Sequence, residues 1–360
     1  MFKFDFGIED DGTEPLQAET APPEVLQSEP FAELSLSQLL ESLPPLISYS
    51  PLLIPLSSSR KSVTLARRDL FDARFQLISE GHGDEPPVDT PAPTSTSALG
   101  FLDAPSDLVP GVYEGGLKTW ECSLDLVGYL DSFRDADSSY FSGKRVLEVG
   151  CGTGIPSVYL LSYLFSENSN VNAHVHMQDY NASVLELITF PNIILAWYMS
   201  PSSAAYRAAA ADEECPPGDP TIPGELTITP ALKSAFTASI AKLGISLAFF
   251  SGPWEGLTTY LKSSVETKHD LVLTSETIYR TEALPALIQL LHQACADAQS
   301  RPLCLVAAKV LYFGVGGGVS EFVRALRSKD MVDKGSSGTA ESVWERKVGV
   351  GRKIMRIDWV

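Results

Sequence analysis

The sequence predicts an α/β fold, because short apolar strands alternate with amphipathic helices from about residue 110 to the end of the chain. The clearest segment is a predicted strand over Arg145–Val149, which enters a glycine-rich turn and continues into a predicted helix over Ile155–Phe165. The chain closes with a predicted hairpin, whose arms Val343–Val348 and Lys353–Trp359 flank the turn Gly349–Gly351. These features indicate one sheet covered by helices.

The remaining elements follow from the spacing of apolar residues along the chain. Further strands are predicted over 173–178, 245–250, 271–274 and 303–308. Further helices are predicted over 119–133, 253–263, 281–298 and 319–327. A helix over 182–198 is predicted to be interrupted at Pro191, because proline disrupts a helix interior.

Residues 1–107 are predicted to form an N-terminal extension that is largely disordered. Stretches rich in Pro, Glu, Ser and Thr bury too little apolar surface to offset the entropy of the chain. Two ordered islands are predicted: a helix over Phe31–Leu43, and a short strand at Val63–Leu65 followed by a helix that ends at Ile78.

Residues 108–360 are predicted to form the main domain. Within it, the stretch from about 200 to 244 is rich in Ala, Pro and acidic residues, which indicates an insertion. One helix is predicted inside this insertion, near 232–243.

The chain has 360 residues and a formal net charge of −18, from 27 basic and 45 acidic residues. This charge argues against a protein that binds duplex DNA through a basic face. It would attract a basic partner, although an acidic, well-solvated surface is the simpler and favoured explanation. Neighbouring cysteines are at least nine residues apart and the five histidines are scattered, so we expect no metal site.

The sequence also bears on location. It contains no secretory signal and no apolar run of about 18 residues, so we expect no membrane span. We expect a monomer in the cytoplasm and nucleus, since short basic stretches such as Arg67-Arg68 would allow nuclear entry.

The sharpest feature is the stretch Val146–Gly154, in which an apolar strand with Glu148 near its end meets Gly150, Gly152 and Gly154. Glycines at such a turn let the backbone approach a ligand closely. A dinucleotide fingerprint would need glycine where Ile155 stands, and the lysine of an ATP-binding loop is missing. An acid before the turn suits a cationic ligand such as S-adenosylmethionine, although a glycine turn without a ligand remains an alternative.

The next two strand ends extend this pattern. Asp179 follows the second strand, where a carboxylate can accept both ribose hydroxyls of a nucleoside. Capping of the next helix is the alternative role for Asp179. Gly252 and Trp254 follow the third strand, where an adenine ring would lie, and a core position is the alternative for Trp254.

Ser275 and Glu276 end the fourth strand and are expected to face cofactor and substrate. Glu276 can accept the Nδ1–H of an imidazole and leave the lone pair of Nε2 free. Its alternative role is a structural carboxylate that caps the following helix.

Two glycine-rich segments are candidate walls of the substrate site. After the fifth strand, Tyr312 and Phe313 precede the glycine cluster that contains Gly316 and Gly317. A plain flexible loop is the alternative there. Before the sheet, the stretch Pro110–Cys122 is a candidate lid over the methionine end of the cofactor, although Trp120 also fits a core position.

These segments together resemble the class I S-adenosylmethionine-dependent methyltransferases. More narrowly, they are similar to the eukaryotic histidine protein methyltransferases that modify a large-subunit ribosomal protein. The resemblance covers about residues 108–360 and is carried by six segments, namely Gly111–Cys122, Val146–Gly154, Gln178–Asn181, Phe250–Trp254, Leu273–Tyr279 and Tyr312–Val319. The start of the chain, Phe2–Gly7, also resembles the aromatic N-terminus of that family.

The resemblance implies a Rossmann-like seven-stranded sheet in the order 3-2-1-4-5-7-6, with strand 7 antiparallel. With the residue arguments above, it assigns cofactor contacts to Thr119, Trp120, Glu121, Cys122, Ser123, Glu148, Gly150, Cys151, Gly152, Gly154, Gln178, Asp179, Tyr180, Gly252, Pro253, Trp254 and Ser275. It assigns substrate contacts to Tyr113, Glu114, Tyr312, Phe313, Gly316 and Gly317. Pro253 departs from the family pattern and removes one backbone donor near the adenine.

The expected reaction is methyl transfer from S-adenosylmethionine to a histidine ring nitrogen of a basic ribosomal protein. The resemblance implies the nitrogen distal to the backbone. A neutral imidazole needs no strong base, so positioning and exclusion of water should supply most of the rate. A protein-lysine methyltransferase and a non-catalytic binding module are the alternatives, and direct reading of nucleic acid is disfavoured by the charge of −18.

Overall fold

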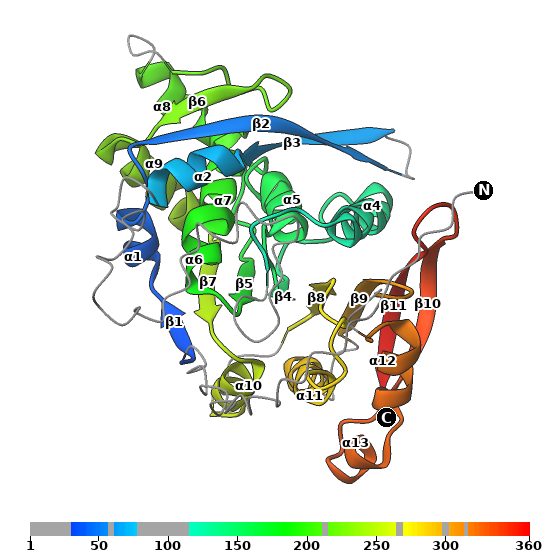
Figure 1. Ribbon diagram of the computed structural model, residues 1–360. Helices are drawn as coiled ribbons and strands as arrows, with labels where there is room; N and C mark the ends of the chain where they lie inside the picture. The colour runs from blue at the N-terminus through cyan, green and yellow to red at the C-terminus, as the bar shows by residue number, and fades with distance from the viewer. Residues whose placement is uncertain are drawn as a thin grey trace, which may run out of the picture.

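A central sheet of eight strands organises the protein in the computed structural model (Figure 1). The structure describes residues 30–56, 61–77, 115–210, 215–263, 269–296, 302–312 and 316–360. The strands of this sheet are β1 (Ala32–Leu34), β4 (Arg145–Val149), β5 (His174–Asp179), β7 (Ser246–Ser251), β8 (Leu271–Ser275), β9 (Leu303–Lys309), β10 (Gly338–Arg346) and β11 (Arg352–Trp359).

The strand order is β1-β7-β5-β4-β8-β9-β11-β10. The five strands from β7 to β9 are parallel, whereas β11 runs antiparallel to both β9 and β10. Counted along the chain without β1, the strands therefore stand in the order 3-2-1-4-5-7-6 that the resemblance implies. The predicted α/β class is confirmed, and β1 is an edge strand that we did not predict.

Helices cover both faces of the sheet (Figure 1). One face packs against α4 (Glu121–Ala136), α5 (Ile155–Leu164) and α7 (Phe190–Tyr198), and the other against α10 (Trp254–Ser263), α11 (Leu284–Ala294) and α12 (Val319–Leu326). Successive side chains of a strand point to opposite faces. Accordingly Val146 belongs to the first apolar core and Leu147 to the second.

The predicted interruption at Pro191 is wrong. The chain forms α6 (Ala182–Val184), then a π-helical turn over Leu185–Thr189, and then α7, which contains Pro191 in its first turn. The wider π turn and the position of Pro191 at the helix start accommodate the missing N–H of proline without a break. The short helix α13 (Lys329–Asp333) was not predicted.

The predicted helix over Phe31–Leu43 is wrong in its first half, which is strand β1. Helix α1 (Leu36–Glu41) begins only after Ser35, whose side chain accepts from the backbone of Gln38 while Gln38 accepts from the backbone of Ser35. This reciprocal cap sets the start of the helix. The chain before it pairs antiparallel with β7.

A second sheet contains three strands in the order β3-β2-β6. Strands β2 (Leu46–Pro55) and β3 (Ser62–Arg68) come from the predicted N-terminal extension, and β6 (Gly224–Thr227) comes from the predicted insertion. We did not predict β2 because of its prolines. Pro51 and Pro55 lie beyond the part of β2 that pairs with β6, where a strand tolerates proline.

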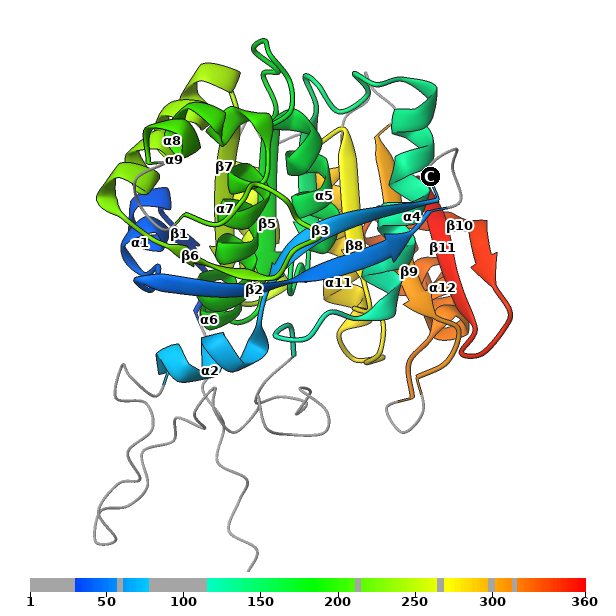
Figure 2. The ribbon, with the colours of Figure 1, turned by 90° about the horizontal axis from the view of Figure 1, so that it is seen from above.

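The second sheet lies across the layer of α4, α5 and α7, as both views show (Figures 1 and 2). Helix α2 (Leu70–Leu77) follows β3 and corresponds to the predicted helix that ends at Ile78, while α8 (Ala204–Ala209) and α9 (Pro230–Leu243) flank β6. The helix predicted inside the insertion is therefore confirmed. The rest of the predicted disordered extension lies outside the described residues.

Among the described residues, no single helix is long and apolar enough to cross a membrane. A bent pair, 182–198 with 201–209, meets the limits on length and composition.

Candidate active site

A pocket of about 520 Å³ opens at the carboxyl ends of β4, β5, β8 and β9. This is the edge at which open α/β sheets bind ligands. Twelve of the residues predicted for the site line this pocket, namely Trp120, Ser123, Gly150, Cys151, Gly152, Asp179, Tyr180, Pro253, Trp254, Ser275, Glu276 and Tyr312. The structure therefore brings the predicted strand ends to one cavity.

The glycine turn between β4 and α5 has a backbone that other residues adopt only with strain. Gly150, Gly152 and Gly154 have φ angles of +60°, +51° and +65°. A Cβ on Gly150 would lie 2.6 Å from Cγ2 of Thr277, and one on Gly152 would lie 3.2 Å from the backbone of Gly116. The turn therefore needs glycine for its conformation and for its close packing.

Asp179 holds the glycine turn and faces the pocket. Its Oδ2 accepts a hydrogen bond of 2.8 Å from the backbone N–H of Gly152, and its Oδ1 accepts one of 3.2 Å from that of Asn181. The N-cap of α6 is Asn181, so Asp179 is not the helix cap that we weighed as an alternative. A carboxylate at this place can accept further hydrogen bonds from a ligand in the pocket.

Gln178 joins three strand ends. Its Oε1 accepts from the N–H of Gly150 and from the indole of Trp254, both at 3.2 Å, and its Nε2 donates to the carbonyl of Gly252 at 2.9 Å. Gln178 is fully buried, so it supports the pocket from behind. Trp254 lines the pocket and is held by its side-chain N–H, in contrast to the alternative of a purely apolar core position.

Glu148 lies behind the glycine turn rather than among the described residues that line the pocket. Its Oε2 accepts from both the backbone N–H and the hydroxyl of Ser157, whereas its Oε1 is buried and has no hydrogen-bond partner among the described residues. Burial raises the pKa of Glu148 from 4.5 to about 7.

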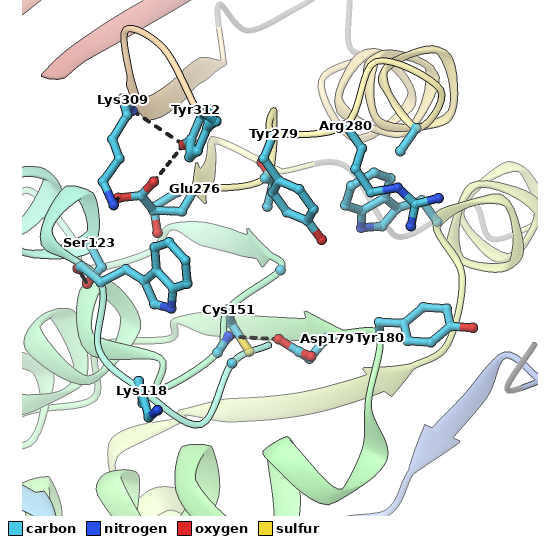
Figure 3. Close-up of a pocket in the computed structure, with 18 of the residues that line it drawn as sticks. Lys118, Ser123, Cys151, Asp179, Tyr180, Glu276, Tyr279, Arg280, Lys309 and Tyr312 are labelled. Atoms are coloured by element: carbon cyan, nitrogen blue, oxygen red, sulfur yellow. Dashed lines mark hydrogen bonds and ion pairs between the residues drawn. The ribbon is translucent and has the colours of Figure 1, made fainter. Parts of the chain in front are cut away.

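Glu276 is the acid on the opposite side of the pocket (Figure 3). Its φ angle of +59° is unusual for a residue with a side chain. Its Oε2 accepts a hydrogen bond of 2.6 Å from the hydroxyl of Tyr312, and its Oε1 accepts one of 3.4 Å from the backbone N–H of Cys122. The Nζ of Lys309 lies 3.8 Å from the same Oε1. Helix α11 has Ala283 as its N-cap, so Glu276 does not cap it, contrary to the alternative considered above.

Lys309 is a cation of the site that the sequence analysis missed. Its Nζ lies 3.2 Å from Oε2 of Glu121 and 4.6 Å from the ring centre of Trp120. The signal was available, because Lys309 directly follows an apolar strand whose end faces the ligand edge. Lys118, Tyr279 and Arg280 also line the pocket and were not assigned to it.

The remaining predicted residues lie near the pocket but outside its described lining. They are Thr119, Glu121, Cys122, Glu148, Gly154, Gln178, Gly252, Gly316 and Gly317. A Cβ on Gly317 would lie 2.2 Å from the carbonyl oxygen of Tyr279, so this glycine permits close packing of the loop on the strand end. Tyr113, Glu114 and Phe313 lie outside the described residues.

The chain is similar to curated proteins over most of its length. It is 35% identical over 270 residues to histidine protein methyltransferase 1 of Saccharomyces cerevisiae, covering 74% of this chain and 69% of that protein. It is 30% identical over 354 residues to the protein of the same name from Schizosaccharomyces pombe, covering 98% and 92%. A homologue from Bos taurus is 33% identical, covering 63% of this chain and 52% of that protein.

Solved structures give weaker matches. An rRNA methyltransferase, aviRa, from Streptomyces viridochromogenes is 16% identical with a TM-score of 0.36, covering 67% of this chain and 86% of that chain. The magnesium protoporphyrin IX methyltransferase of Synechocystis is 12% identical with a TM-score of 0.32, covering 66% and 85%. No protein-family model matches the chain. The identity to the two yeast proteins, over most of both chains, shows that this chain belongs to the histidine protein methyltransferase 1 family.

Proposed function

We propose that the chain transfers a methyl group from S-adenosylmethionine to the distal ring nitrogen of a histidine in a large-subunit ribosomal protein. The observation that carries the proposal is one pocket with two functional halves (Figure 3). The glycine turn and Asp179 form one half, and Glu276 with Tyr312 forms the half that faces it.

The first half suits S-adenosylmethionine. The pocket of about 520 Å³ lies within the usual range for a ligand of this size, roughly 300–1,000 Å³. Asp179 can accept the ribose hydroxyls, and Tyr180 and Trp254 offer aromatic surface to an adenine ring. When bound, this cofactor supplies a methyl group on a positively charged sulfur.

The second half suits a neutral imidazole. The Glu276 carboxylate can accept Nδ1–H of the acceptor ring, which fixes the tautomer that has a free lone pair on Nε2. Transfer of the methyl group from a bound cofactor to Nε2 would leave a neutral thioether and place the positive charge on the ring. Glu276 lies where it would stabilise that charge, and Nδ1 keeps its proton during the step.

The acceptor class rests on two further points. The segments Leu273–Tyr279 and Tyr312–Val319 carry the resemblance to enzymes that modify a large-subunit ribosomal protein. The net charge of −18 suits a basic acceptor.

The test is a transfer assay with labelled cofactor on ribosomal proteins from cells that lack this enzyme, followed by amino-acid analysis of the product. We expect histidine methylated at the distal nitrogen. Methyl-lysine would overturn the histidine acceptor, and methylation at the other ring nitrogen would overturn the assigned geometry.

The role of Glu276 is tested with Glu276→Gln, which keeps the size of the side chain and removes its charge. We expect kcat to fall by about tenfold to a hundredfold while the Kd for S-adenosylhomocysteine stays unchanged. Glu282→Gln, at an exposed residue outside the pocket lining, is the matched control. Equal kcat values in the two variants would refute the role of Glu276.

A further inference from the structure

We propose that strand β3, although outside the methyltransferase sheet, is part of the cofactor site, and that Arg68 positions the glycine turn through the π-helical segment. The inference rests on the proposed function, because the turn is assigned to S-adenosylmethionine. The N-terminal β2–β3 segment would then help to hold the glycine turn in place.

Arg68 ends β3 and is 1% exposed. Its guanidinium donates to Asp72 at 2.7 Å, to Gln76 at 2.8 Å and to the carbonyl oxygen of Leu187 at 2.6 Å. Burial of a charge is costly unless it is paired and hydrogen-bonded. The planar guanidinium of Arg68 satisfies this requirement with three separate acceptors, and its rigid geometry holds these acceptors in fixed positions.

The Leu187 carbonyl lies where a proline removes the α-helical donor. Leu187 stands four residues before Pro191, and proline has no N–H to donate to it in an α-helical pattern. Arg68 donates to this carbonyl from another part of the chain. The guanidinium therefore stabilises the irregular π-helical turn that precedes α7.

Two side chains connect the π-helical segment with the glycine turn through hydrogen bonds. Thr189, the last residue of the π turn, donates to the carbonyl of Gly152 at 2.6 Å, and Asn192 donates to that of Thr153 at 2.9 Å. Asn192 also accepts from the backbone N–H of Arg68 at 2.8 Å. Thr189 and Asn192 are three positions apart, so they lie on one face of the helical segment, toward the glycine turn.

A parallel link starts from the residue before Arg68. The guanidinium of Arg67 lies 3.5 Å from the hydroxyl of Thr119, which donates to that of Thr153 at 3.2 Å. Thr153 lines the pocket. Consecutive residues of β3 thus reach the same turn by two routes.

The experiment compares Arg68→Lys with Arg207→Lys in the full chain. Arg207 holds the carbonyls of Tyr198 and Ser200 at the far end of α7, and no described bond connects it with the glycine turn. Both variants lose a guanidinium that donates to backbone carbonyls, at Leu187 before α7 or at Tyr198 and Ser200 at its other end, and both should lose stability. Only Arg68→Lys should raise the Kd for S-adenosylhomocysteine, by about fivefold to tenfold.

Hydrogen exchange of the backbone amides of residues 150–154 in the unliganded protein gives a second measurement. We expect faster exchange in Arg68→Lys than in Arg207→Lys. Thr189→Val should reproduce the weaker binding without touching the buried arginine, and its combination with Arg68→Lys should be less than multiplicative, because both act on the same turn.

Three results of these experiments distinguish a positioning role of Arg68 from a general effect on stability and from a failure of the proposed cofactor. If Arg68→Lys lowers Tm but changes neither Kd nor the exchange of the turn, the positioning role is overturned. The same holds if Arg207→Lys changes the turn equally, since the effect is then general loss of stability. If the wild-type chain binds no S-adenosylhomocysteine, the proposed cofactor fails, and the exchange comparison alone supports or overturns the positioning role.

Discussion

Glu148 should make the protein less stable as pH rises, which is opposite to the effect of most carboxylates. Burial raises the pKa of Glu148 from 4.5 to about 7, and its Oε1 has no hydrogen-bond partner among the described residues. Between these two pH values the folded chain keeps a proton that the unfolded chain has lost. The free energy of unfolding therefore falls through this range and levels off above pH 7.

The magnitude follows from the difference between the two pKa values. One pKa unit corresponds to about 1.4 kcal/mol, so the shift from 4.5 to about 7 costs about 3 kcal/mol above pH 7. Glu148→Gln removes the titration and keeps an oxygen that can accept from Ser157. As pH rises from 4.5 to above 7, the free energy of unfolding of Glu148→Gln should therefore increase by about 3 kcal/mol relative to that of the wild type.

The assay is urea unfolding of both proteins at several pH values between 4.5 and 8. Taking the difference between the two curves at each pH cancels every other titrating group, and it separates the titration from any constant effect of packing the amide. A difference that stays flat across this range would mean that Glu148 ionises as an ordinary exposed carboxylate does, and the reasoning from burial would fail.

Three further predictions use the same structure. Burial lowers the pKa of His176 from 6.5 to about 4, so between these pH values the unfolded chain binds a proton that the folded chain does not, and the free energy of unfolding should fall by about 3 kcal/mol from pH 6.5 to 4. In urea unfolding, His176→Gln should lack this acid-dependent loss, and a variant with the same loss as the wild type would refute the role of His176. Gly150→Ala should cost about 1–3 kcal/mol more than Gly143→Ala, because both have positive φ but only Gly150 meets a side chain, Thr277, at 2.6 Å; equal losses on thermal unfolding would contradict the contact. Asp179→Asn should weaken binding of S-adenosylhomocysteine by about tenfold or more in calorimetry, and an unchanged Kd would exclude a contact with the cofactor.

The sequence predicted much of the site because its signals are local. The strand–glycine–helix pattern at Val146–Gly154 places a ligand turn without any knowledge of the partners of the strand. Parallel strands end at one edge, so Asp179, Trp254 and Glu276 could be assigned to a common cavity from their positions after apolar runs. The structure places all three on the pocket wall.

Local patterns failed where the chain departs from regular spacing. Because of the prolines in Leu46–Pro55, we did not predict strand β2. Pro51 and Pro55 lie where β2 has no partner on the side of β6, so the strand tolerates them. Pro191 suggested a break, but it lies in the first turn of α7, directly after a π turn. Lys309 was not assigned to the site despite its place at the end of an apolar run, and only the structure shows the carboxylates of Glu121 and Glu276 beside it.

The sequence by itself therefore determined the α/β class, the edge of the sheet that binds ligand and the acids that face it, because apolar periodicity and glycine placement report backbone geometry directly. Only the tertiary structure decided which distant segments lie against one another. It paired the N-terminal β2 with β6 from the insertion, and it set Arg68 against the carbonyl of Leu187. Periodicity shows which face of an element is buried but not what covers it, and the partner of a buried charge is known only once the chain has folded.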